Sequence, residues 1–396
     1  MHASTLVPNA AAESGVVSRA RSRLSPFAAV GGALGLFAAV RLAGAAVLAM
    51  AAWALGREPL AVLGRSWDSM WYLGIAAHGY GRTEHFRPGV VHSDLAFFPL
   101  YPALVRTVAA ITPLGDDAAG LAVSWLAACA AACGIYAIGA HLHGRAVGTA
   151  LVVLWGLLPH SVVLSMAYTE PVLTAFAAWS LYAVLRGRWV WAGSLAALAG
   201  LSRPNGFAVA AAVIVAAAWE AWRRRGRVSH RLWTGAALAP LGWTAYVLWV
   251  GRRTGDLFGG YFRVQDLWGS RFDLGQGALG FVRHLLLQGD RFVFPMVLVI
   301  VAAGVVLYAL LVADRAPLPL VVYSGVLLLV VLGGSGFFGS KPRFLLPAFP
   351  LLLPLARALV RTARARPWHA TVVVAALAGL SFAYGAYVVL VARTPL

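Results

Sequence analysis

Residues 27–55 read FAAVGGALGLFAAVRLAGAAVLAMAAWAL, an apolar run whose single charged residue is Arg41. A transmembrane helix needs about 20 predominantly apolar residues, so this run can span a bilayer and is too long to be the core of a cleaved signal peptide. An arginine inside the membrane is costly unless it faces the protein interior or a polar cavity. We therefore expect a retained first span in which Arg41 is a paired buried charge that organises the bundle.

The composition of the whole chain indicates the same class. Of 396 residues, 61% are hydrophobic and 12% are charged, and the mean hydropathy is +0.78. No soluble domain needs so much apolar surface, so we expect an all-α polytopic membrane protein. The net charge of +18 would suggest nucleic acid in a soluble chain, but here the arginines flank apolar runs and orient the protein by the positive-inside rule. No nucleic-acid partner is expected.

Later spans are predicted from apolar length and from arginine-rich breaks, giving about eleven with the first. Several are shorter than a full crossing needs, which indicates broken helices or uncertain ends. The later spans are residues 120–140, 146–163, 171–185, 190–201, 207–222, 232–250, 292–312, 318–332, 344–356 and 369–391. Cys129 and Cys133 lie one helical turn apart inside a span, so neither a disulfide framework nor a metal cluster is indicated.

The arginine distribution predicts a cytoplasmic N-terminus. Residues 1–26 form a basic cytoplasmic leader and residues 27–396 a single membrane domain, with a first outer loop at 56–119 and a second at 251–291. The later arginine-rich loops fall on the inner face only if Phe97–Thr112 does not cross the membrane. We therefore expect this segment to form a juxtamembrane helix. Lys341 is the only lysine in an Ala-, Gly- and Arg-rich chain, which indicates a G+C-rich bacterial genome and hence a bacterial plasma membrane.

The first outer loop carries the sequence WDSMWY at Trp67–Tyr72, followed by apolar residues at helical spacing up to Tyr80. Trp and Tyr favour the headgroup layer, so we predict a short interfacial helix with Asp68 near its start. The carboxylate would face water where lipid-linked substrates reach it. The alternative interpretation is a plain aromatic belt with a solvated aspartate.

Three later segments place polar residues at the predicted outer face. Tyr168–Pro171 lies at the mouth of a span, and there Thr169 could cap the helix with Pro171 at its first position. Ser202–Gly206 reads SRPNG, a plain turn by composition but one that contains an arginine. Lys341–Phe344 puts two cations before another span, where they could contact a phosphate. The arginines of the second loop need either an anionic lipid phosphate or the loop's own aspartates as partners.

No P-loop, Rossmann glycine pattern, HExxH or CxxC motif occurs, so nucleotide-driven transport and zinc hydrolysis have no support. What remains is an outer carboxylate with several cations, ringed by aromatic side chains. Such a site can deprotonate an acceptor hydroxyl and stabilise a departing phosphate. A glycosyltransferase that uses a lipid-phosphate sugar needs both capabilities.

These residues resemble a known family. Trp67-Asp68-Ser69, Trp71-Tyr72, Ile75-Ala76, His78-Gly79-Tyr80, Glu84-His85 and Ala96–Pro102 are similar, in this order, to the first-loop signature of PIG-V-type mannosyltransferases of the GT-C superfamily. Pro159-His160-Ser161, Tyr168-Thr169-Glu170, Ser202–Gly206 and Lys341–Phe344 resemble the family's later motifs. The resemblance implies a GT-C bundle with two juxtamembrane helices in the first outer loop. It also implies transfer of mannose from polyprenyl-phosphate-mannose to a glycolipid.

The same resemblance assigns roles to single residues. Asp68 is the expected general base of an inverting displacement, and Arg203, Lys341 and Arg343 are expected to bind the donor phosphate. Glu84 and Glu170 would hydrogen-bond sugar hydroxyls or orient these cations. His85, Tyr168 and Asn205 complete the expected substrate-binding set. The superfamily has members with and without a metal requirement, and no ligand spacing here decides between them.

Two alternatives remain open from the sequence. The scaffold could transfer another sugar or use a protein acceptor, although protein O-mannosyltransferases usually show paired acidic residues early in the first loop. Here the only adjacent pair, Asp116-Asp117, comes late in it. The chain could also be a non-enzymatic lipid or solute transporter, which should show repeat symmetry and mid-membrane ionisable residues. No convincing repeat is seen, and Arg41 is the clearest mid-span charge.

Overall fold

The computed structural model describes residues 26–87, 90–288 and 291–392, so the predicted leader lies outside the described residues. Within this part the chain is almost entirely helical, as the hydrophobic pattern predicts. The helices are α1 (Pro26–Ala54), α2 (Pro59–Gly64), α3 (Asp68–His78), α4 (Leu100–Ile111), α5 (Asp116–His143), α6 (Arg145–Gly156), α7 (Glu170–Leu185), α8 (Trp189–Gly200), α9 (Phe207–Arg223), α10 (His230–Leu238), α11 (Leu241–Thr254), α12 (Gly260–Leu267), α13 (Gln276–Gln288), α14 (Val293–Ala313), α15 (Leu318–Gly333), α16 (Lys341–Leu345), α17 (Leu353–Ala365) and α18 (Pro367–Leu390). Short 3₁₀ turns are η1 (Asp94–Ala96), η2 (Ser161–Ser165), η3 (Pro204–Gly206), η4 (Phe338–Ser340) and η5 (Phe349–Leu352).

Two small antiparallel pairs are the strands of this part of the chain. β1 (Thr83–Arg87) pairs with β2 (Val90–Ser93) inside the first predicted outer loop. β3 (Arg271–Phe272) pairs with β4 (Gly334–Ser335), which joins the second predicted outer loop to the end of α15.

Length and hydropathy identify the helices that can cross a membrane. Five of the described helical segments are long and apolar enough, or six if one bent pair counts as a single span. They are residues 28–54, 116–143, 204–223, 293–313 and 367–390, and the bent pair joins 338–345 to 349–365 at 74°. The remaining predicted spans fall on shorter helices, among them α6, α7, α8 and α15. The chain is a polytopic membrane protein built from long and broken helices.

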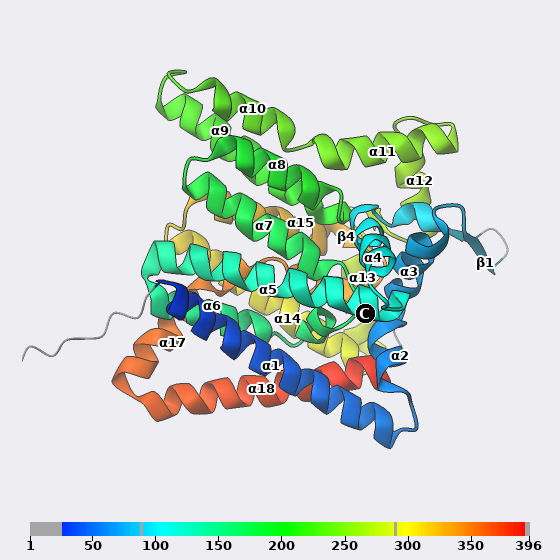
Figure 1. Ribbon diagram of the computed structural model, residues 1–396, viewed down its shortest axis with the longest axis horizontal. Coiled ribbons are helices and arrows are strands. Elements are labelled where there is room, and N and C mark those ends of the chain that lie inside the picture. Colours follow the sequence, from blue (N-terminus) through cyan, green and yellow to red (C-terminus); the bar gives the residue numbers. More distant parts are fainter. Residues whose placement is uncertain (1–25, 88–89, 289–290, 393–396) are drawn as a thin grey trace, which may run out of the picture.

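The long helices lie side by side and define two ends of the molecule (Figure 1). At one end, drawn on the right, gather α2, α3, α4, α12 and β1, and we call this the α3 end. At the opposite end lie α17 and the turns that join α7 to α8 and α9 to α10. Glycines allow the closest helix contacts: a Cβ on Gly193 of α8 would lie 2.1 Å from the carbonyl oxygen of Gly235 on α10.

Arg41 faces the protein interior, as predicted, and is 2% exposed. Its partners are hydroxyl and carbonyl groups, whereas a charge pair was predicted. Nη1 donates to Ser161 Oγ at 2.7 Å and to the Gly156 carbonyl at 3.1 Å, and Nη2 donates to Ser165 Oγ at 2.9 Å. Ser161 in turn contacts Ser381 of α18 at 3.1 Å. The arginine therefore organises α1, α6, η2 and α18 through hydrogen bonds.

Two helices predicted for the first loop are present. α3 begins at Asp68 itself, and the 12-residue α4 follows Pro99 inside the predicted non-crossing segment 97–112. Figure 1 shows both at the α3 end of the bundle. The aromatic residues form the contacts between them, because Tyr72 packs edge-on against Phe97 and Tyr101 with centroids 5.1 and 5.3 Å apart. α3 and α4 thus form a rigid aromatic layer over the end of α5.

Candidate functional site

Asp68 is held by the tight turn between α2 and α3. Trp67, directly before it, has a φ of +48°, which is an unfavourable left-handed conformation for a bulky residue. Such strain persists only where the surrounding structure imposes it and often marks functional sites. Asp68 then becomes the first residue of α3, where the positive end of the helix dipole stabilises its charge. Its side chain is 21% exposed.

Glu170 occupies the equivalent position on α7, as the first residue of that helix. The preceding segment is fixed by Ser124, whose hydroxyl donates to the Tyr168 carbonyl at 2.8 Å and accepts from its N–H at 3.1 Å. Thr169 sits at the predicted capping position, but its hydroxyl donates to the Ser202 carbonyl at 3.2 Å and does not cap α7. The prediction that Thr169 caps α7 through its side chain is therefore wrong. Its hydroxyl instead links this segment to the SRPNG turn.

Arg343 and Arg203 join these two carboxylates into one buried chain of charges. Arg343 Nη2 lies 2.7 Å from Asp68 Oδ2, and its Nε lies 3.0 Å from Glu170 Oε1. Arg203 forms an ion pair with the same oxygen of Glu170. The order Asp68–Arg343–Glu170–Arg203 alternates in sign and sums to zero. We call these four residues the charge cluster.

Burial gives the charge cluster its significance. The side chains of Arg343 and Arg203 are 6% exposed and that of Glu170 is 1% exposed, so all three are removed from bulk water. Removing an ionised group from water costs free energy, so such groups are buried only when they are paired with one another. Asp68, at 21%, is the member through which the cluster reaches solvent.

Aromatic rings surround the charge cluster on several sides. The Arg343 guanidinium lies 5.3 Å from the Tyr168 ring and 5.4 Å from the Phe344 ring, and Arg203 lies 5.8 Å from Phe344. Burial, the largest influence, raises the pKa of the Tyr72 and Tyr168 phenols well above the ordinary value. Both phenols therefore stay neutral at physiological pH and add no negative charge beside the charge cluster.

The SRPNG turn is more than a plain connection, because it presents Arg203 to the charge cluster. Asn205, 6% exposed, has neither amide oxygen nor nitrogen bonded to any described residue. A buried amide without partners is costly and marks a place where a ligand or water can bind. Gly206 is required here, since a Cβ on it would lie 2.2 Å from the Ala199 carbonyl oxygen.

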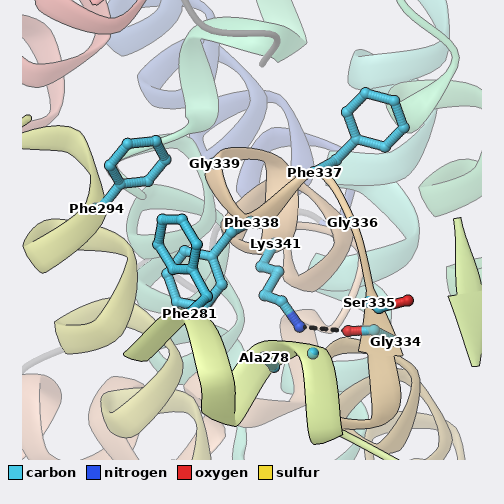
Figure 2. Close-up of a pocket in the computed structure, with 11 residues that line it drawn as sticks. Ala278, Phe281, Phe294, Gly334, Ser335, Gly336, Phe337, Phe338, Gly339 and Lys341 are labelled. Atoms are coloured by element: carbon cyan, nitrogen blue, oxygen red, sulfur yellow. Dashed lines mark hydrogen bonds between the residues drawn. The ribbon is translucent and has the colours of Figure 1, made fainter. Parts of the chain in front are cut away.

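Lys341 lies on the same short helix as Arg343 but is not part of the charge cluster. Its ammonium group donates to the Gly334 carbonyl at 2.8 Å and also to the Val331 carbonyl. Figure 2 shows it in the wall of a cavity of about 310 Å³ with Phe281, Phe294 and Phe338. The sequence grouped Lys341 with Arg203 and Arg343, whereas the structure places it in a separate, largely apolar space.

Glu84 and His85 are also apart from the charge cluster. Both lie on β1 of the hairpin, where Glu84 forms an ion pair with Arg82. The hairpin packs against the aromatic layer through His92, which stacks on Trp268 with centroids 4.1 Å apart. The two residues remain candidates only for contacts with a substrate that extends past the α3 end.

In the second predicted outer loop, two arginines have aspartate partners from the loop itself. Arg263 pairs with Asp256 at 2.8 Å, and Arg271 pairs with Asp266 at 2.9 Å. The loop's own aspartates therefore pair with these two arginines. Arg253 instead lies over the Trp249 ring, 5.0 Å from its centroid.

Sequence reasoning did not assign Tyr72 and Phe344 to the site, although both contribute to it. Tyr72 falls four residues after Asp68 on α3, so helical spacing would have placed it beside the carboxylate. Phe344 directly follows Arg343. Among the described residues, no group of three or more His, Cys, Asp or Glu side chains is placed to hold a metal ion.

Comparisons with known proteins identify the fold. No protein-family model matches the chain, and no curated protein does so either. Among solved structures, the crystal structure of the oligosaccharyltransferase of Archaeoglobus fulgidus, in complex with Zn and sulfate, is similar over 90% of this chain, with a TM-score of 0.50 and 13% identity. A structure of the archaeal oligosaccharyltransferase AglB from the same organism, with an inhibitory peptide and a dolichol-phosphate, gives a TM-score of 0.48 and 14% identity over 89% of the chain.

The chain spans about half the length of these structures, 54% and 55% respectively. The first of them is a GT-C superfamily member, and the likeness agrees with the expected all-α polytopic membrane fold. At this identity the likeness concerns the fold alone.

Proposed function

We propose that this protein is a membrane glycosyltransferase that transfers mannose from polyprenyl-phosphate-mannose to a lipid or glycolipid acceptor at the outer face of the membrane. The observation that carries the proposal is the charge cluster at the α3 end of a GT-C-type bundle. It combines a carboxylate open to solvent with two buried guanidinium groups, which are the groups that this reaction needs.

The two arginines suit a lipid-linked phosphate. Guanidinium groups bind phosphate oxygens in a fixed planar geometry. The helix N-termini of α3 and α7 meet at the same place and favour a negative charge. A donor phosphate that contacts Arg343 would compete with Asp68 and Glu170 for its N–H groups. Donor binding would therefore release Asp68 from its ion pair at the moment when a base is needed.

Asp68 is the proposed general base. It takes the proton of the acceptor hydroxyl while that oxygen forms a bond to the anomeric carbon and the bond to the phosphate oxygen breaks. The leaving phosphate keeps the electron pair, and Arg203 and Arg343 stabilise its charge. One such displacement inverts the anomeric centre, so a β-linked donor gives an α-mannoside.

The Lys341 cavity suits the apolar part of the donor. Lys341 and Arg343 belong to one five-residue helix, α16, so the cavity and the charge cluster adjoin on either side of it. Phenylalanine rings and glycines form most of the cavity wall (Figure 2). An isoprenoid chain attached to a phosphate at Arg343 would find an apolar surface there. Lys341 then marks the polar edge of this surface.

The choice of mannose rests on the resemblance of the first-loop motif to PIG-V-type enzymes. Transfer of another sugar, a protein acceptor, and lipid or solute transport are the competing functions. The late acidic pair does not favour a protein O-mannosyltransferase, because Asp117 pairs with Arg65 at 2.5 Å, beside the start of α5. A transporter needs no general base, so its activity should not depend on Asp68 as a proton acceptor.

The deciding experiment incubates the purified protein with labelled polyprenyl-phosphate-mannose and lipids extracted from the host. Label should move into a lipid fraction with the parent protein and not with Asp68→Asn. Polyprenyl-phosphate-glucose in a parallel reaction tests the sugar. Label in protein would indicate a protein acceptor, and uptake into sealed vesicles that is unaffected by Asp68→Asn would indicate transport.

A further inference from the structure

A second cavity lies at the end of the bundle opposite the charge cluster. Its volume is about 700 Å³, within the ~300–1,000 Å³ typical of ligand sites. The ends of α7 and α9 and the beginnings of α8, α10 and α15 form its wall. Figure 1 shows the turns between α7 and α8 and between α9 and α10 at this end. It is therefore separate from the site proposed above, and its role does not rest on that function.

The charges around this cavity are almost all positive. Arg223 and Arg224 line it, and Arg186, Arg188, Arg225 and Arg227 belong to the two turns beside it. Glu220 is the only acid between residues 185 and 232, and it is paired with Arg224 at 2.5 Å. The other five arginines have no carboxylate partner among the described residues. These arginines are exposed and give this end an excess of positive charge, which attracts anions.

The rest of the lining is apolar. Val184, Leu185, Ala216, Leu232 and Leu318 contribute aliphatic walls next to the arginines. Trp189 and Trp219 complete them, and Trp222 and Trp233 nearby are 70% and 54% exposed. Exposed tryptophans are typical of the headgroup level of a bilayer. The cavity thus offers cations beside an apolar surface, next to exposed tryptophans of the kind that lie at the headgroup level.

We propose that this cavity binds the phosphate group of an anionic glycerophospholipid, with Arg223 on the phosphate and the acyl chains along the aliphatic wall. Basic pockets between transmembrane helices bind such headgroups on the cytoplasmic side of membranes. The excess of arginine predicts that this end faces the cytoplasm. A soluble anion could satisfy the charge but would leave the apolar wall without a partner.

The test compares the purified full chain in nanodiscs of phosphatidylcholine alone and of phosphatidylcholine with phosphatidylglycerol. Phosphatidylglycerol should raise the thermal unfolding temperature of the parent and appear as a bound lipid in native mass spectrometry. In titrations with short-chain phosphatidylglycerol in detergent, Arg223→Gln should bind about fivefold more weakly, the value of one arginine near a lipid surface. Arg364→Gln is the matched control, because Arg364 is exposed on α17, outside the cavity.

Three results would overturn the proposal. The first is equal protection by both lipid compositions, and the second is an equal loss in Arg223→Gln and Arg364→Gln, which would indicate bulk charge alone. The third is full protection by inorganic phosphate in phosphatidylcholine nanodiscs, which would indicate a small-anion site. If Arg223→Gln fails to fold, Leu318→Trp keeps every arginine and fills part of the cavity. It should lose phosphatidylglycerol binding, and unchanged binding would contradict the proposal.

Discussion

Arg343 Nη2 lies 2.7 Å from Asp68 Oδ2, so the proposed base and a proposed phosphate ligand are joined in the structure. The two residues come from α16 and α3, which are far apart in the sequence. In this state the carboxylate is engaged by a cation, and the guanidinium is not free for a phosphate. Under the proposed function, the ion pair persists until a donor phosphate takes the place of Asp68 at Arg343. Asp68 and Arg343 should therefore be tested together.

Asp68→Asn should insert and fold but lose nearly all transfer. Asn has the size of Asp and can hydrogen-bond, but it cannot take a proton at neutral pH. Base catalysis is typically worth ~10²–10⁴-fold, so kcat should fall by that factor. Donor affinity should be kept or improved, because Arg343 loses a competing carboxylate. Single-turnover rates and donor titrations measure the two effects separately.

Asp68→Glu is the informative companion variant. It keeps the acid and moves it by one methylene, so a base should retain partial activity. If Asp68 merely anchors α3, Asp68→Asn should instead lower the unfolding temperature and leave turnover per folded molecule nearly unchanged. Near-parental rates for Asp68→Asn would make the assignment wrong, and Glu84 would be the next residue to examine.

Glu170→Gln should destabilise the protein strongly. Glu170 is 1% exposed and lies between two guanidinium groups that are themselves buried. Removing one partner of a buried ion pair typically costs ~3–5 kcal/mol, because the remaining charge is left uncompensated. Glu220→Gln is the control, since its ion pair with Arg224 lies at the surface and is worth ~0–1 kcal/mol. Thermal unfolding of both variants measures the difference.

The donor should reverse part of this destabilisation. A phosphate that binds Arg203 and Arg343 replaces the missing negative charge, so the donor should raise the unfolding temperature of Glu170→Gln more than that of the parent. An equal rise in both proteins would place the phosphate away from these arginines.

Much of the fold could be predicted from the sequence, because hydrophobic length and arginine position act locally. A short helix with Asp68 near its start was predicted from apolar spacing, and a separate helix within 97–112 from the topology and two prolines; α3 and α4 match them. The partners of Arg41 did not follow, since serines on η2 give no pattern that singles them out. Pairing between distant segments is a property of packing, and the sequence does not display it.

The site was predictable in its residue types but not in its grouping. Asp68, Glu170, Arg203 and Arg343 were all expected to be functional, and the structure brings them together. Lys341 was grouped with them because it is two residues from Arg343. On a helix that spacing turns side chains about 200° apart, so the two cations face different spaces.

The two sides of α4 in the first predicted outer loop should be accessible from the same side of the membrane. Cysteines at positions 93 and 116 lie before and after α4, so they report on whether that helix crosses. In a background with Cys129→Ala and Cys133→Ala, Ser93→Cys and Asp116→Cys should both react with an impermeant thiol reagent in intact cells. Reaction at one position alone would mean that α4 crosses the membrane.

Lys341 and Arg203 should contribute independently to donor binding, whereas Arg203 and Arg343 should be coupled. Arg203→Ala should weaken donor binding by ~1.5–3 kcal/mol, roughly tenfold to a hundredfold, as expected for a lost charge-assisted contact. Arg203 and Arg343 share one oxygen of Glu170, so the double variant should deviate from additivity by ~0.5–3 kcal/mol. Lys341 contacts backbone carbonyls beside the phenylalanine cavity. The effects on donor binding of a Lys341 substitution and of Arg203→Ala should therefore add within ~0.3–0.5 kcal/mol in the double variant.

Donors of different chain length also test whether Lys341 acts on the apolar chain or on the phosphate of the donor. Lys341→Met and Ala278→Phe alter the cavity and should weaken a long-chain polyprenyl-phosphate donor more than a short-chain one. Arg203→Ala should weaken both equally, because it acts on the phosphate that the two donors share. If Lys341→Met weakens both donors equally and is coupled to Arg203→Ala, the ammonium group binds the phosphate. The sequence-based grouping of the three cations would then be correct.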